Sequence, residues 1–221
     1  MNDYSITGES FSSRDEKGMG MNVQQQELFE IEPLHNICGI DEAGRGPLAG
    51  PVCAAAVVLP PDFDFSLLGD SKQLTEKKRE KAEAYIKEHA VAWAVAWATH
   101  KEIDELNILR ATMLAMRRAY DKVAARTLVS VVLVDGNKEP DIPCPCQAIV
   151  KGDSKIHEIM AASILAKTAR DRFMECADRK WPLYGFGGHK GYPSASHRQA
   201  CIDYGLCPIH RKTFRIAAPK S

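Results

Sequence analysis

The feature that most constrains this chain is a short apolar run that ends on two adjacent carboxylates, followed at once by a glycine-rich turn. It occupies Ile37–Pro47 and reads ICGIDEAGRGP. Because adjacent strand residues point to opposite faces, Asp41 and Glu42 can share one site only if the strand stops or bends there. Gly44 and Gly46 permit such a bend and let the backbone approach a ligand closely. The alternative is a solvated turn with two exposed acids.

The rest of the chain alternates strand-like and helix-like segments. Strands are predicted where apolar runs end in turn residues, at residues 38–41, 51–59, 91–99, 128–134 and 148–150. Helices are predicted where apolar residues recur at helical spacing, at residues 76–89, 103–125, 156–180 and 196–204. The short loop between the first two strands favours antiparallel pairing. This order predicts an α/β fold: a mixed five-stranded sheet flanked by helices, with a small helical C-terminal extension.

Three aspartates share one context, because each follows a predicted strand. Asp41 and Asp135 come just before glycine-containing sequence, and Asp153 follows the short strand at 148–150. If these strands are neighbours, the aspartates and Glu42 gather at one edge of the sheet. A strand followed by Asp-Gly-Asn is also a common structural turn, so this pattern alone leaves both readings open.

Four carboxylates that lie close together need cations to balance their negative charge. Each pair of like charges ~4 Å apart costs on the order of 1 kcal/mol in water and more at a protein surface, and two divalent ions would offset that repulsion. Oxygen-only ligands favour Mg²⁺ or Mn²⁺ over zinc. Two such ions form the usual arrangement for in-line phosphoryl displacement.

Composition narrows the class of protein. No apolar run approaches the ~20 residues of a membrane span, and no signal peptide is recognisable. The seven cysteines include no C-x2-C pair, which favours reduced thiols in the cytoplasm over a disulfide framework or a zinc ribbon. The net charge is zero, but residues 151–221 hold 13 Lys and Arg against 6 Asp and Glu. That third could offer a basic surface to a polyanion, and nothing suggests more than a monomer.

The stretch Asp41–Val52 (DEAGRGPLAGPV) resembles the signature of ribonuclease HII. Further blocks match that family in order: Asp70–Leu74 (DSKQL), Val134–Gly136 (VDG), Lys151–Asp153 (KGD) with Ala161–Lys167 (AASILAK), His189–Tyr192 (HKGY) and Pro208–Arg211 (PIHR). The blocks are short, but their common order over residues 36–214 makes a chance match remote.

The resemblance implies a ribonuclease H-like fold and endonucleolytic cleavage of the RNA strand in RNA–DNA hybrids. It also implies incision at a single ribonucleotide in duplex DNA, leaving 3′-hydroxyl and 5′-phosphate ends. The residues implied to be catalytic and metal-binding are Asp41, Glu42, Asp135 and Asp153. The predicted substrate-binding residues are Gly44, Arg45, Gly46, Lys72, Lys151, Ser154 and Tyr192.

The chemistry of these residue types supports the roles. A 2′-hydroxyl tells RNA from DNA at one position, and a glycine turn can read it without touching a base. An aromatic ring on the next sugar, here Tyr192, would crowd a second 2′-hydroxyl. His189 and His210 are interpreted as structural or phosphate-facing, and Asp171 as a helix salt-bridge partner.

Three parts of the chain are predicted. Residues 1–30 form a polar, disordered tail, residues 31–180 the ribonuclease H-like catalytic domain, and residues 181–221 a basic, substrate-binding extension. Within the tail, Gln25–Phe29 (QQELF) resembles peptides that dock on bacterial sliding clamps. The alternative is that Leu28 and Phe29 begin the ordered domain and pack on its core.

Two other functions remain open at this level. The same fold could serve a DNA nuclease of the resolvase or integrase type, which would cleave an all-DNA duplex as readily as one carrying a ribonucleotide. A non-catalytic module could bind hybrids without cutting them, although the intact set of acids argues against it.

Overall fold

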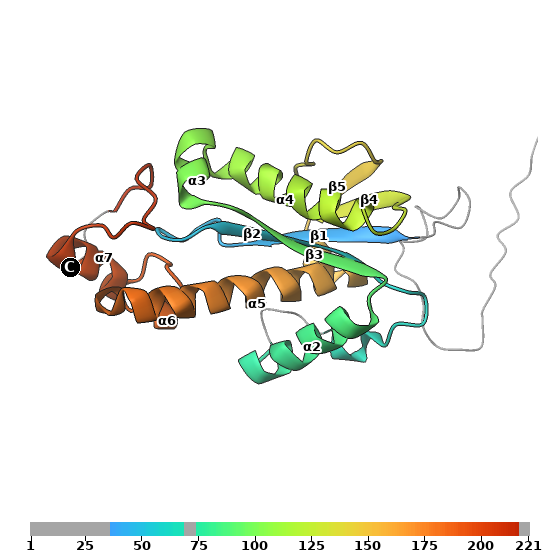
Figure 1. Cartoon of the computed structure of the whole chain (residues 1–221), viewed down its shortest axis with the longest axis horizontal. Coiled ribbons are helices and arrows are strands. Elements are labelled where there is room, and N and C mark those ends of the chain that lie inside the picture. The colour runs from blue at the N-terminus through green and yellow to red at the C-terminus, as the bar shows by residue number, and fades with distance from the viewer. Residues whose placement is uncertain (1–35, 69–73, 217–221) are drawn as a thin grey trace, which may run out of the picture. The chain divides into compact units, whose positions relative to one another are not determined.

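The computed structural model describes residues 36–68 and 74–216, all within one compact unit, Leu34–Ser221. These residues form one sheet with helices on both faces (Figure 1). The strands are β1 (Ile37–Ala43), β2 (Val52–Val58), β3 (Ala92–Ala98), β4 (Val131–Asp135) and β5 (Cys146–Ile149). The helices are α2 (Glu76–His89), α3 (His100–Leu106), α4 (Ile108–Ala124), α5 (His157–Lys180), α6 (Phe186–His189) and α7 (Ala195–Tyr204). The short 3₁₀ helices are η1 (Phe65–Leu67), η2 (Gly152–Ser154) and η3 (Pro182–Tyr184).

The sheet is mixed and its described strands follow the order β3-β2-β1-β4-β5. β1 and β3 each pair antiparallel with β2, whereas β1–β4 and β4–β5 are parallel pairs. The predicted fold class, a mixed five-stranded sheet flanked by helices, is confirmed. β1 is the central strand, so the acids at its C-terminal end lie at the middle of one sheet edge.

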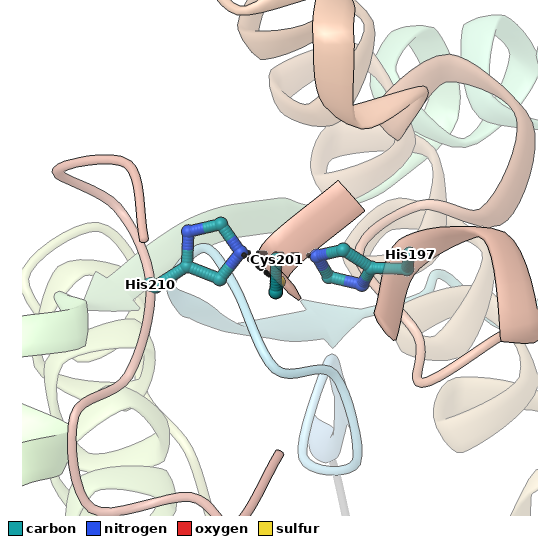
Figure 2. Close-up of side chains that lie close together, drawn as sticks. All are labelled: His197, Cys201 and His210. Carbon is teal, nitrogen blue, oxygen red and sulfur yellow. Dashed lines mark hydrogen bonds between the residues drawn. The ribbon is translucent and has the colours of Figure 1, made fainter. Parts of the chain in front are cut away.

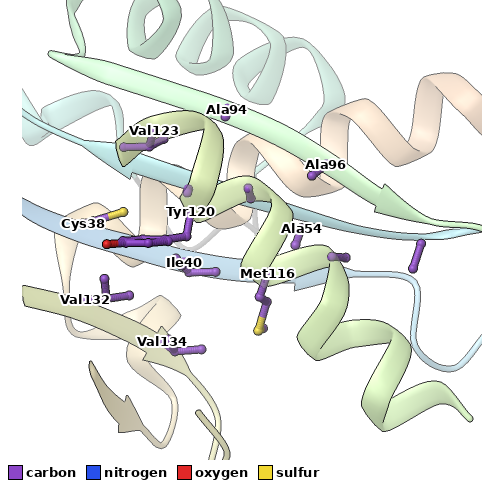
Figure 3. Close-up of a cluster of buried hydrophobic side chains, with 14 of the residues drawn as sticks. Cys38, Ile40, Ala54, Ala94, Ala96, Met116, Tyr120, Val123, Val132 and Val134 are labelled. Carbon is purple, nitrogen blue, oxygen red and sulfur yellow. The ribbon is translucent and has the colours of Figure 1, made fainter. Parts of the chain in front are cut away.

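Each face of the sheet packs on its own helices. Helices α3 and α4 cover one face, and α2 and α5 cover the other (Figure 1). On the first face, Ile40 of β1 and Val134 of β4 pack with Met116 and Tyr120 of α4 (Figure 3). The α4 residues lie four apart, the spacing that brings side chains onto one helix face.

Helix α5 lies unusually close to β1, and Gly39 makes this possible. A Cβ added at Gly39 would come within 2.1 Å of the Glu158 backbone carbonyl carbon, a distance that no side chain tolerates. The absence of a side chain therefore lets the helix rest on the strand just before its two acids.

The helix predicted at 103–125 is in fact two helices, so that prediction was wrong in its boundaries. The chain breaks at Asn107, which has φ 68° and ψ 165°, a backbone conformation that side-chain-bearing residues rarely adopt. The Asn107 side chain accepts hydrogen bonds from the N–H groups of Leu109 and Arg110 at 3.0 and 3.2 Å. Apolar periodicity continues across the break, which is why the pattern alone missed this N-cap.

We expect Asn107→Ala to lower the free energy of unfolding by about 1.5–3 kcal/mol, because it removes the cap and keeps the strained backbone. Asn107→Gly also removes the cap but relieves the strain, so its cost should stay within about 0.5 kcal/mol. Urea unfolding of both variants is the measurement. Equal destabilisation by the two would contradict the proposed strain at this position.

The C-terminal residues pack on the loop between β1 and β2. A hydrophobic cluster joins Ala49 of that loop to Met174, Phe186 and Ile209. Backbone hydrogen bonds join Leu48 N to Gly191 O at 2.8 Å and Gly50 N to Ile209 O at 2.9 Å. The predicted extension at 181–221 thus meets the glycine-rich turn directly.

All seven cysteines lie among the described residues and are free thiols. A search of the described helices finds none that is long and apolar enough to traverse a bilayer. The segment Gln25–Phe29 and the whole predicted tail lie outside the described residues.

Candidate functional site

Asp41 and Asp135 lie on neighbouring parallel strands. β1 and β4 pair in register up to Ile40 and Val134, so the next residue of each strand reaches the same edge of the sheet. Asp41 is only 5% exposed. Its carboxylate accepts a hydrogen bond at 2.7 Å from the next backbone N–H and another from the Ser163 hydroxyl on α5.

Asp153 reaches this edge through the tight turn that follows β5. Lys151 adopts a left-handed conformation with φ 58° and directs the chain into η2. There the backbone N–H of Gly152 donates to Asp135 Oδ1 at 2.7 Å, and that of Asp153 donates to the same oxygen at 3.4 Å. The carboxylate of Asp135 therefore holds the turn that carries the third aspartate.

Glu42 joins the group in a way that the sequence did not predict. β1 was expected to end or bend at Asp41, but it continues to Ala43. The neighbouring strand β4 ends instead, at Asp135, so Glu42 has no β4 residue beside it. Its side chain can then reach round the edge of the sheet, and Arg45 Nη1 lies 3.4 Å from its Oε1.

The structure brings the four predicted acids to one hollow of about 300 Å³. The other lining residues are Ala43, Gly44, Arg45, Gly46, Ser163, Lys167, Arg170, Asp171 and Tyr192. Five segments that are distant in the chain thus meet there: the end of β1 with its turn, the end of β4, η2, the middle of α5, and the loop that carries Tyr192.

The electrostatics of this hollow disfavour bare negative charge. The pKa of Asp41 lies well above its usual value, because the carboxylate is buried and because Glu42 and Asp135 carry like charge beside it. Burial also raises the pKa of Glu42, although Arg45 opposes that shift. A cation in the hollow would remove both penalties.

The donor set fits hard divalent ions. All four side chains offer carboxylate oxygens, the ligands that suit Mg²⁺ and Mn²⁺. The four carboxylates are arranged loosely. Among the described residues, the His, Cys, Asp and Glu ligand atoms that come within 4.8 Å of one another in a group of three belong to His197, Cys201 and His210, and not to these four acids. The carboxylates thus match the metals in chemistry without forming a closed ligand shell.

Two buried arginines hold the glycine-rich turn, and sequence reasoning assigned a role to neither. Arg211 is fully buried and donates to the carbonyl oxygens of Gly44, Arg45, Gly50 and Pro51 at 2.6–3.3 Å. Arg170 on α5 donates to the carbonyls of Ala49, Pro51 and Lys190 at 3.0–3.2 Å. The shape of the turn is therefore set by guanidinium groups more than 100 residues away in the chain.

Gly44 is required by this arrangement. It has φ 97°, and a Cβ placed there would lie 1.9 Å from Arg170 Nε. A side chain at this position would displace the arginine that supports the turn.

The predicted substrate-binding residues divide into three groups. Gly44, Arg45, Gly46 and Tyr192 line the hollow, and Tyr192 is 47% exposed. Lys151 and Ser154 flank Asp153 on the outside, where both are exposed, and neither is among the residues that line the hollow. Lys72 lies outside the described residues.

Besides Arg170, three residues of α5 line the hollow: Ser163, Lys167 and Asp171. The sequence indicated no role for the first two and only a salt bridge for Asp171. Ser163 donates to Asp41, and Lys167 forms an ion pair with Asp171 at 3.2 Å. Asp171 also pairs with Arg79 at 3.6 Å, which confirms its interpretation as a salt-bridge partner. Ser163, Lys167 and Asp171 lie four residues apart, so they share one face of α5. That spacing is the sequence signal from which their place beside the acids could have been predicted.

Comparisons with known proteins point to one family. The family model described as ribonuclease HII matches residues 38–217. The chain is 55% identical over 184 residues to a ribonuclease HII of Dechloromonas aromatica, covering 83% of this chain and 93% of that protein. Among solved structures, ribonuclease H2 of Pyrococcus horikoshii is similar with 29% identity and a TM-score of 0.68, over 82% of this chain and 94% of that one. Bst-RNase HIII in complex with Mn²⁺ shares the fold at 19% identity with a TM-score of 0.69, over 96% of this chain and 76% of that one.

Proposed function

The chain belongs to the ribonuclease HII family, and we propose from this that it is an endonuclease that hydrolyses the RNA strand of RNA–DNA hybrids. We propose further that it incises duplex DNA at a single embedded ribonucleotide, leaving 3′-hydroxyl and 5′-phosphate ends. The observation that carries this proposal is the meeting of four carboxylates and a glycine-rich turn in one hollow.

Asp41, Glu42, Asp135 and Asp153 would hold two divalent ions, Mg²⁺ or Mn²⁺. Bound there, the ions would supply an activated water and charge stabilisation for the leaving oxygen. The task of the chain's own groups is positioning: Asp41 is anchored by Ser163, and Asp135 is anchored by the N–H of Gly152. The similar Bst-RNase HIII, crystallised with Mn²⁺, is consistent with this choice of ions.

The glycine-rich turn would read the 2′-hydroxyl of the ribonucleotide. The carbonyls of Gly44 and Arg45 already accept from Arg211, so we assign the reading to the backbone N–H groups of the turn. Gly46 lies against the Tyr192 ring, with its would-be Cβ 3.5 Å from the ring carbon Cε1. The turn and the ring thus form adjacent positions for two consecutive sugars.

Tyr192 would contact the deoxyribose that follows the ribonucleotide. We expect Tyr192→Ala to slow incision at a single ribonucleotide about 10-fold, since a base stacked on an aromatic ring is worth ~1–3 kcal/mol and the sugar contact is set at the lower end of that range. Cleavage within an all-RNA strand of a hybrid should change less, because the junction is absent there. The measurement is the cleavage rate of the wild-type chain and of the variant on each of the two substrates. An equal loss of rate on both would argue against a role of Tyr192 in recognising the RNA–DNA junction.

One cleavage assay tests the proposed function against its alternatives. The full chain is incubated with three duplexes, all-DNA, DNA with one ribonucleotide, and RNA–DNA hybrid, with Mg²⁺ or with a chelator. We expect metal-dependent cuts in the last two only, mapped to the 5′ side of the ribonucleotide in the second. Equal cleavage of all-DNA would indicate a DNA nuclease, and binding without any cut would indicate a hybrid-binding module.

Affinity for the duplex should fall steeply with salt if the basic C-terminal third contacts the phosphates. Fluorescence anisotropy at several ionic strengths measures the slope, with the uncut complex kept intact by a chelator. A flat response would place the contact elsewhere.

Docking of Gln25–Phe29 on a sliding clamp stays a separate prediction, tested by clamp binding before and after removal of residues 1–30.

A further inference from the structure

A second cluster of metal-ligand types lies away from the carboxylates, in the C-terminal part of the chain. His197 and Cys201 occupy successive turns of one face of α7, and His210 comes from the segment that follows (Figure 2). Their exposed fractions are 0%, 7% and 2%. Buried polar side chains of this kind need partners, so their mutual arrangement is informative.

The three ligand atoms converge. His197 Nε2 and His210 Nε2 lie 3.1 Å apart, Cys201 Sγ lies 3.2 Å from His210 Nε2, and all three atoms lie within 4.8 Å of one another. Around a tetrahedral zinc ion with its usual bond lengths, two nitrogens are about 3.3 Å apart and a nitrogen and a sulfur about 3.6 Å. The observed separations differ from these by only a few tenths of an ångström.

The outer ring nitrogen of His197 is also held as a metal-bound histidine requires. His197 Nδ1 lies 2.9 Å from the Tyr192 carbonyl oxygen, which can only accept, so the proton is on Nδ1 and the lone pair of Nε2 faces His210. A backbone carbonyl in this place is the usual support of a ligating histidine.

His210 admits two arrangements. Its Nδ1 can accept from the Cys207 N–H at 3.0 Å, in which case Nε2–H donates to His197. Alternatively, Nδ1–H donates to the Cys207 carbonyl at 3.3 Å, which leaves the Nε2 lone pair for an ion. The first arrangement is a plain hydrogen-bonded pair, and the second is a ligand.

We propose that His197, Cys201 and His210 form a zinc site that ties α7 to the segment carrying Arg211. A thiolate with two imidazoles selects Zn²⁺ over the hard ions suited to the carboxylates. Binding releases the thiol proton of Cys201 to solvent. The fourth position of the tetrahedron would be taken by water, because Cys207, although buried in the adjoining hydrophobic cluster, is not among the ligand atoms that converge here.

The proposed zinc site lies next to residues that support the hollow. One ligand neighbours Arg211, which holds the carbonyls of Gly44 and Arg45, and another is bonded to the carbonyl of Tyr192. An ion here would hold the glycine-rich turn and the segment of Tyr192, which both line the hollow, without touching the substrate. The proposal concerns metal binding and stability, and it holds whether or not the proposed nuclease activity is correct.

Cobalt(II) provides a direct test, because only a thiolate ligand produces the near-ultraviolet sulfur-to-cobalt charge-transfer band. The reduced full chain is titrated with Co²⁺. We expect this band to saturate at one ion per chain, to disappear in Cys201→Ala, and to persist in the control Cys176→Ser, whose thiol is exposed. Zn²⁺ should displace the cobalt and abolish the band. Carboxylate-bound cobalt contributes no such band, so the two sites are distinguished.

Thermal unfolding provides a second measurement, made first on the wild-type chain. A saturating excess of Zn²⁺ over a chelated sample should raise the midpoint of the wild-type chain by about 5–10 °C, and His210→Gln should remove most of that rise. Absence of the charge-transfer band from the wild-type chain would overturn the proposal in favour of the hydrogen-bonded pair. A band that survives in Cys201→Ala would overturn the assignment of the ligands.

Discussion

Asp41→Asn is expected to reduce cleavage by about 10³-fold or more and, at the same time, to raise the stability of the metal-free chain. The loss follows if Asp41 holds a divalent ion, since the charge stabilisation that such an ion supplies is worth several kcal/mol. The gain follows from the burial of Asp41 beside Glu42 and Asp135, which raises its pKa. Asparagine keeps the shape and removes the charge.

The stability gain should depend on pH in a defined direction. Well below about pH 4 the carboxyl of Asp41 is protonated in both the folded and the unfolded chain, so the substitution has little effect there. As the pH rises, the unfolded chain ionises first and the folded chain loses stability relative to it. The advantage of Asp41→Asn should therefore grow towards neutral pH, to about 0.5–2 kcal/mol.

Single-turnover cleavage in Mg²⁺ and thermal melts in a chelator measure the two effects. Asp121→Asn serves as a matched control, because it removes an exposed aspartate that pairs with Arg117 at 2.9 Å and should change stability by about 0.5 kcal/mol or less. Wild-type turnover by Asp41→Asn would refute its metal-binding role. A lower melting point at neutral pH would show that Asp41 is not strained by its neighbours.

Arg211→Lys is expected to cause the largest loss of stability, about 2–5 kcal/mol. Arg211 is 0% exposed, and its guanidinium satisfies four carbonyl oxygens. Burial and the nearby charge of Arg170 lower its pKa to about 9. Lysine carries the charge but cannot present the planar set of donors, so it leaves buried acceptors without partners.

The same change should slow incision at a single ribonucleotide about 10²-fold, because displacing the turn by ~1 Å misplaces the substrate. Divalent-ion binding by the carboxylates should change little, and Mn²⁺ titration of the variant checks this. Arg126→Lys is the control, since that arginine is exposed and donates to the Trp93 carbonyl at 3.1 Å. If Arg211→Lys unfolds at a lower temperature but cleaves at the normal rate, the conformation of the glycine-rich turn does not depend on the Arg211 guanidinium.

The sequence was most informative where local patterns and chemistry coincide. The five strands followed from apolar runs bounded by turn residues, because strand formation depends on such patterns. The helix predicted at residues 76–89 is α2 with the same bounds, and Thr75 caps it by accepting from the Lys78 N–H at 3.4 Å. The break at Asn107 was missed, since a single residue with positive φ leaves the periodicity on either side unchanged.

By itself, the sequence determined the order of strands and helices, the placing of Asp41, Glu42, Asp135 and Asp153 near the C-terminal ends of strands, and the family resemblance. These are properties of short segments, and short segments carry their own propensities and chemistry. Only the tertiary structure decided which face each acid reaches, that Arg211 shapes a turn more than 160 residues earlier, and that His197, Cys201 and His210 converge. Such contacts depend on packing between distant segments, and no spacing along the chain encodes them.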